Sequence, residues 1–291
     1  MLEPFALWPC IAGPVVLLLG IVSARKELAA ASGADQLIVL APTFIAAPLA
    51  VFGAEHLAGG PILAGGVPKW IPAPLFWAYF VGVALIAAAL SFALKRYMQW
   101  SAPLLALMIL IFVLTIHVPG VFAHPHERNF WTVMVRDTSF AGGALILTGA
   151  VRRPQNRTMI FLGRLSIAIA LLLFGVEHFL HPLNAPGVPL PKMTPAWVPL
   201  PALWAWLTGA VCLITGAALL FNRRSRDAAV LMGFVMTFLT LFLYLPILLM
   251  DRGTGQVVEG VNYVGDTLMY AGTVLMVAWA IRSETADKPA R

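Results

Sequence analysis

Ionisable side chains inside apolar segments are the residues of this 291-residue chain most able to do chemistry. Glu55-His56 and Glu177-His178 each end an apolar run, and Asp137 and Asp266 lie a few residues inside two others. An imidazole or a carboxylate can bind a metal ion, exchange a proton or hydrogen-bond a polar ligand. Because charge is costly in hydrocarbon, such groups face the interior of a helix bundle and mark candidate functional sites.

The composition predicts that membrane-spanning helices position these groups. Apolar residues make up 60% of the chain, charged residues 11%, and the mean hydropathy is +0.87, which excludes a soluble enzyme. The two cysteines lie in apolar runs and need not pair. A hydrocarbon layer about 30 Å thick requires roughly 20 apolar residues per helix. Scanning at that length predicts an all-α, multi-pass protein with nine spans, at about 5–23, 37–57, 75–94, 102–119, 131–151, 160–181, 202–221, 228–249 and 261–281.

The basic residues predict the orientation of the spans. The connections after spans 1, 3, 5 and 7, together with the C-terminal tail, hold 14 of the 19 Lys and Arg residues. The positive-inside rule places these connections in the cytoplasm and the N-terminus outside, in a bacterial inner (plasma) membrane. The pI near 9.7 then reflects topology and contact with the lipid bilayer, and no nucleic-acid partner is expected.

Two parts of the chain resemble each other in sequence. Phe52-Gly-Ala-Glu-His56 recurs 122 residues later, Pro68-Lys-Trp70-Ile-Pro72 recurs after 127 as Pro195-Ala-Trp197-Val-Pro199, and Asp137-Thr138 recurs after 129. We therefore expect a leading helix and loop (1–36), two four-helix units in parallel (37–151 and 152–282) and a cytoplasmic tail (283–291). The drift of the offset indicates small insertions in outer loops.

The spacing of the ionisable residues along a helix determines which of their side chains lie on one face and can share a ligand. Adjacent Glu and His side chains diverge by about 100°, so one member of each pair could face a common axis. In the second unit His181 lies on the same helix face as Glu177 and His178, whereas Gly59 stands at its position in the first. The second unit is therefore expected to hold the richer site.

Two Pro-rigid loops carry a Trp, at Trp70 and Trp197, above a Glu-His pair. These loops are expected to cap an outward-facing cavity, although an interfacial Trp belt explains the same residues. A flat quinone ring could lie between such a Trp and the apolar helix walls. The resulting candidate site consists of Glu55, His56, Trp70, His117, Asp137, Glu177, His178, His181, Trp197 and Asp266.

Both units resemble a known family, and the second resembles it more closely. His178-Phe-Leu-His-Pro182, Met193-Thr-Pro-Ala-Trp197-Val-Pro-Leu-Pro201 and the small-residue helix from Thr208-Gly209 to Gly216 are similar to motifs of the DoxX-like family of four-helix bacterial membrane proteins. Many members carry a Glu shortly after that Gly, where this chain has Cys212 and, in the first unit, Leu85. The resemblance implies a redox-associated membrane subunit, as in thiosulfate:quinone oxidoreductase or oxidative-stress complexes, and a quinone is one candidate cofactor.

Other roles for the same residues stay open. His56, His178 and His181 could ligate a metal ion such as copper, or haem, although the chain lacks the CxxCH motif of c-type haem attachment. The chain could instead be a non-catalytic scaffold for a periplasmic or membrane partner, and any catalysis would belong to a subunit of a membrane oxidoreductase. The two Asp residues could also simply hold helices together. Arg136 can neutralise Asp137, but Gly265 stands at its matching position, so Asp266 needs another partner.

Overall fold

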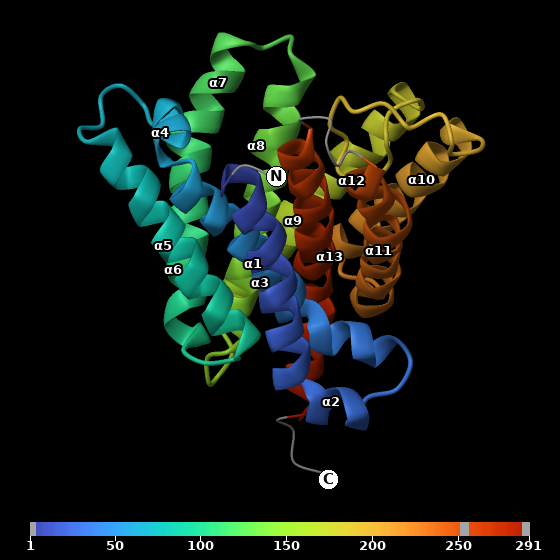
Figure 1. The fold of residues 1–291 in the computed structure, drawn as a ribbon. Helices are drawn as coiled ribbons and strands as arrows, with labels where there is room; N and C mark the ends of the chain where they lie inside the picture. The colour runs from blue at the N-terminus through green and yellow to red at the C-terminus, as the bar shows by residue number, and fades with distance from the viewer. Residues whose placement is uncertain (1–3, 251–255, 287–291) are drawn as a thin grey trace.

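The computed structural model describes residues 4–250 and 256–286, and Figure 1 shows them as a bundle of long helices. These described residues form no strand beyond one isolated bridge. The long helices are α1 (Pro4–Ser23), α3 (Ala34–Ala58), α5 (Pro74–Ala93), α6 (Met98–Phe112), α8 (Arg128–Ala150), α9 (Arg157–Leu180), α10 (Pro201–Leu220), α11 (Ser225–Leu239) and α13 (Val257–Ala286). The short elements are α2 (Arg25–Ala30), α4 (Gly60–Leu63), α7 (Val118–Ala123), α12 (Leu245–Met250), a 3₁₀ turn η1 (Ala64–Gly66) and two π-helical turns, η2 (Val113–His117) and η3 (Thr240–Tyr244).

The chain is an all-α polytopic membrane protein. Eight of its described helical segments are long and apolar enough to cross a bilayer, one fewer than the nine predicted from the sequence. The difference is α8, which has 23 residues but carries Arg128, Arg136 and Asp137. It packs against α6, α9 and α13, so neighbouring helices cover much of its polar surface.

The helices of residues 37–151 interleave with those of residues 152–282 instead of forming separate bundles, and we refer to these two ranges as the first and the second unit. The first helix of the first unit, α3, packs along α13, the last helix of the second, and α9 packs along α8 in the same way. Helices α5 and α10 lie outside α3 and α9, while α6 and α11 lie against α8 and α13. The leading helix α1 packs against α3 and α5. The main hydrophobic core is therefore one continuous cluster, built from helices of both units.

The two ends of the bundle differ in charge. One end carries α2 and the end of α13 and lies at the bottom of Figure 1; the other carries α4, α7 and α12, and we refer to it as the α4 end. Loops rich in Lys and Arg lie at the α2 end, where Lys95 forms an ion pair with Glu27 at 2.7 Å and Arg226 binds Asp35. The ends of α3 and α9, which carry the two Glu-His pairs, both lie at the α4 end.

Unusual backbone conformations recur at a constant interval of 127 residues. The six described non-glycine residues with positive φ form three such pairs: Ala73 and Leu200, Lys95 and Asn222, and Tyr97 and Arg224. The π-helical turns η2 and η3 are separated by the same interval, and each is followed two residues later by a proline. A proline cannot donate the main-chain hydrogen bond of an α-helix, which accounts for an irregular turn at both places.

Candidate functional site

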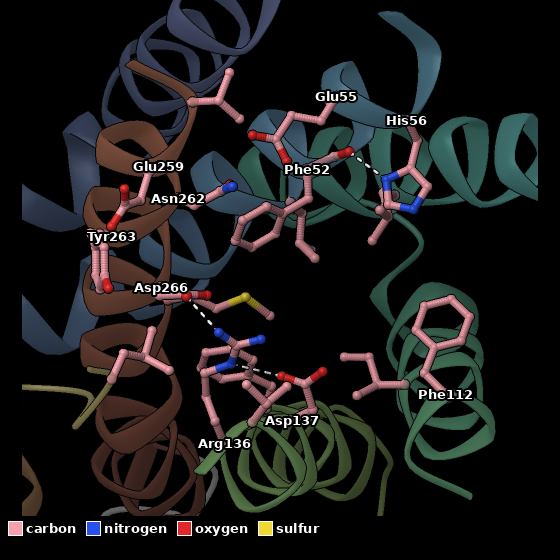
Figure 2. A pocket seen from close by; sticks show the side chains of 18 of the residues that line it. Phe52, Glu55, His56, Phe112, Arg136, Asp137, Glu259, Asn262, Tyr263 and Asp266 are labelled. Atoms are coloured by element: carbon pink, nitrogen blue, oxygen red, sulfur yellow. Dashed lines mark hydrogen bonds and ion pairs between the residues drawn. The ribbon is translucent and has the colours of Figure 1, made fainter. Parts of the chain in front are cut away.

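A cavity of about 610 Å³ lies between α3, α5, α6, α8 and α13, near the α4 end. Figure 2 shows that its polar side chains come from α3, α8 and α13. We call it the His56 cavity, and its polar lining consists of Glu55, His56, Asn129, Arg136, Asp137, Glu259, Asn262, Tyr263 and Asp266. Aromatic rings and aliphatic side chains, including Phe52, Phe112 and Phe140, form the other walls. A volume of this size and a few convergent polar groups are typical of a small-molecule site.

Arg136 joins the two units at the base of this polar lining. Its Nε donates to Oδ1 of Asp137 at 2.8 Å, and its Nη1 donates to Oδ2 of Asp266 at 2.6 Å. The guanidinium also lies 5.7 Å from the centre of the Phe140 ring. The expectation that Asp266 needs a partner from elsewhere, because Gly265 precedes it, is confirmed, and that partner is Arg136 itself. Because α8 and α13 pack together, one cation reaches both carboxylates.

His117 adds a fourth group to this network. It ends the π-helical turn η2, and its Nε2 lies 2.8 Å from Oδ2 of Asp137. Since a carboxylate oxygen accepts, the imidazole is the donor. His117 thus reaches the cavity through Asp137, and it is not itself part of the cavity wall.

Glu55 binds an amide instead of a cation. The side-chain N–H groups of Asn262 donate to Oε1 of Glu55 at 2.8 Å and to Oε2 at 3.1 Å. The Glu55 residue is buried, with 7% of its surface exposed. Asn262 and Asp266 are four residues apart on α13, so both face the cavity. Sequence reasoning missed Asn262, although its spacing from Asp266 was a usable signal.

His56 presents one ring nitrogen to the cavity. Its Nδ1 donates to the main-chain oxygen of Phe52 at 2.8 Å, so Nε2 of the neutral ring is a hydrogen-bond acceptor. Among residues 4–250 and 256–286, Nε2 has no hydrogen-bond partner. Helix α5 lies close beside it, because a Cβ added at Gly82 would be only 2.9 Å from Cβ of His56. The ring is thus fixed by its own helix and by its neighbour.

The corresponding space in the second unit is filled. Nδ1 of His178 donates to the oxygen of Phe174 at 2.6 Å, and its Nε2 accepts from the main-chain N–H of Gly187 at 2.9 Å. Tyr244 Oη donates to the oxygen of Pro186 at 2.9 Å. The open cavity thus lies beside the histidine of the first unit and not beside that of the second, in contrast to the expectation that the second unit holds the richer site.

Several predicted site residues lie away from the His56 cavity. Glu177 forms an ion pair with Arg128 at 3.1 Å and lies 3.7 Å from His181, at the α4 end of α9. Trp70 is 73% exposed and Trp197 45%, and neither lines the cavity. The prediction that these two residues cap it is therefore wrong. Their exposure at the end of the bundle fits the alternative of an interfacial Trp belt.

The three histidines predicted as metal ligands do not converge. Both ring nitrogens of His178 are engaged, so that side chain has no lone pair left for a metal ion. His181 lies beside Glu177, outside the cavity that His56 lines. Within the described part of the chain, no group of three His, Cys, Asp or Glu residues is arranged to hold a metal ion. These residues therefore do not form the predicted metal site.

Together, the fold and the cavity define a polytopic helical membrane protein with a polar pocket between the helices of two interleaved units. No family model, no curated protein and no solved structure matches the chain.

Proposed function

We propose that the protein is a redox-associated subunit of a membrane complex and that it binds a quinone-class molecule in the His56 cavity. The observation that carries this proposal is a cavity of about 610 Å³ with apolar walls and this polar lining. A flat ring suits the space between Phe52 and Phe112, while its oxygens face His56 and Glu55. Quinone chemistry couples electrons to protons, and both polar groups can exchange a proton.

In this proposal the chain supplies the binding site and the proton-exchanging groups, and a partner subunit exchanges the electrons. The Arg136 ion-pair network holds α8 and α13 in register beneath the ligand. The apolar walls exclude water from the ring, which strengthens the hydrogen bonds that the polar lining makes.

We further propose that 37–151 and 152–282 are two copies of one DoxX-like unit. The support is the motif resemblance, the three pairs of left-handed residues 127 positions apart, and the two π-helical turns at that same interval. Both Glu-His pairs also place Nδ1 of the histidine on the oxygen four residues earlier. The excess of basic residues at the α2 end supports an inner-membrane orientation with the N-terminus and the α4 end outside.

Blocking the cavity tests the binding proposal. Val133 lines the cavity from α8 and is partly exposed, so Val133→Trp places an indole in the proposed ring position. We expect the Kd for a short-chain ubiquinone analogue to rise at least about tenfold, equivalent to roughly 1.4 kcal/mol. The measurement is calorimetric titration of the purified protein in nanodiscs, corrected for partition into empty nanodiscs.

The matched control is Val83→Trp, which adds the same side chain on α5 at a position that is 60% exposed and outside the cavity. Its Kd is expected to equal that of the unmodified chain. Failure of the unmodified protein to bind the analogue, or equal Kd values for Val133→Trp and the control, would refute the proposal.

A further inference from the structure

The filled cavity of the second unit shows what kind of group lies against its histidine. His178 corresponds to His56, and Tyr244 corresponds to His117 by the 127-residue interval. The main-chain N–H of Gly187 donates to Nε2 of His178, and a Cβ added at Gly187 would lie 3.4 Å from the Tyr244 ring. The same Cβ would lie 3.6 Å from Leu239, which corresponds to the cavity residue Phe112. The peptide of Gly187 thus occupies the space that matches the His56 cavity.

This peptide belongs to a loop that is built to enter the bundle. The interval between matching residues rises from 122 at His178 to 127 at Trp197, so the loop between them is five residues longer than its counterpart. Ala185 N–H donates to the oxygen of Lys192 at 2.8 Å, and Thr194 N–H donates to that of Leu183 at 3.0 Å, forming a tight hairpin.

The tip of the hairpin is inside the protein. Ala185 and Val188 are each 2% exposed, and the side-chain oxygen of Asn184 accepts from Nη2 of Arg128 at 2.6 Å. We call residues 185–188 the plug. In the first unit α4 and η1 occupy this part of the chain, and Gly65 and Gly66 have open space where a side chain would be.

We infer that the ligand of the His56 cavity takes the place of the plug and donates an O–H hydrogen bond to Nε2 of His56. This inference rests on the proposed function, and within the quinone class it selects the reduced, hydroxyl-bearing form. Both histidines have the same Nδ1 contact, so both neutral rings present an acceptor. The plug satisfies that acceptor with an N–H, whereas an oxidised quinone offers only carbonyl oxygens, which cannot donate.

Three probes with the same ring separate these chemistries: trimethylhydroquinone, its oxidised quinone, and its dimethyl ether, which lacks both O–H donors. We expect anaerobic titration of the protein in nanodiscs to give a Kd for the hydroquinone at least about tenfold below the other two, since these leave the buried acceptor of His56 without a hydrogen bond. His56→Phe should abolish this preference. His56→Gln, whose side-chain oxygen can accept, should retain part of it.

The control is His181→Phe, which changes a histidine outside the cavity and is expected to leave all three Kd values unchanged. Thermal unfolding of each variant reports whether it is folded, and His56→Gln provides a second, milder change. The inference is overturned if the quinone binds as tightly as the hydroquinone, or if His56→Phe keeps the preference. If the unmodified protein still binds a probe in those cases, and Val133→Trp loses that binding, the proposed function stands and only this inference fails. If the unmodified protein binds none of the three probes, the proposed function and this inference are both overturned.

Discussion

Replacement of Arg136 by Met is expected to lower the stability of the folded protein by about 3–5 kcal/mol, because it leaves two buried carboxylates without their cation. Arg136 donates to both Asp137 and Asp266, and its side chain is only 16% exposed. A loss of that size corresponds to a fall in the unfolding temperature of roughly 6–20 °C. Intrinsic tryptophan fluorescence during heating in detergent measures it.

Neutralising the carboxylates distinguishes electrostatics from packing. The triple variant Arg136→Met, Asp137→Asn, Asp266→Asn should recover most of the lost unfolding temperature, because no charge is then left unpaired. Arg157→Met is the control, and it is expected to leave the unfolding temperature unchanged, since the Arg157 side chain is 90% exposed and its contact with Glu284 is 3.7 Å long. An unfolding temperature of Arg136→Met equal to that of the control would show that the bridge between the units is not a stabilising element.

Replacement of Gly187 by Val is expected to expel the plug. Gly187 has φ +129°, a conformation that L side chains rarely adopt, and its new Cβ would meet the Tyr244 ring. Strain of about 1–3 kcal/mol is expected from such a residue. The adjoining hydrogen bonds to His178 and Tyr244 would then be lost. Cys212 corresponds to the cavity residue Leu85 and is fully buried, so its modification by a small thiol reagent reports the opening.

The experiment uses a Cys10→Ser background, so that Cys212 is the reacting thiol. We expect its labelling rate to rise at least roughly fivefold, because the lower end of that strain, about 1 kcal/mol, already raises the open population by that factor. Gly65→Val, at the matching loop of the first unit where nothing lies within 4 Å, should leave the rate unchanged. Equal rates in the two variants would mean that the loop does not guard the second cavity.

The helices could be predicted from the sequence because hydrocarbon thickness fixes the length of a spanning helix. Each predicted span lies within a described helical segment or extends past its end by a residue or so. The α8 helix deviates in hydropathy alone, because its polar residues face other helices. The interleaving of the units could not be predicted, since apolar periodicity shows which face of a helix is buried but not which helix covers it.

Because the sequence does not show which helices pack together, it could predict the polar residues of the candidate site but not which of them meet. The structure brings together Glu55, His56, Asp137 and Asp266, all of which stood out as ionisable groups in apolar runs. It separates Glu177 from them, because Arg128 of the neighbouring unit binds that carboxylate. The offset revealed five extra residues in the second unit, but their length alone does not show that they fold into the bundle.

The packing of α3 on α13 and of α9 on α8 has a consequence for any chain that holds only one such unit. A polypeptide with only one four-helix unit would leave its first and last helices uncovered, and could shield them by pairing with an identical molecule. Both subunits of that dimer would carry the same loop, so their two cavities would both be open or both be filled by the loop. Two units in one polypeptide are free of this restriction, because a loop can fill the cavity of one unit while the cavity of the other unit stays open.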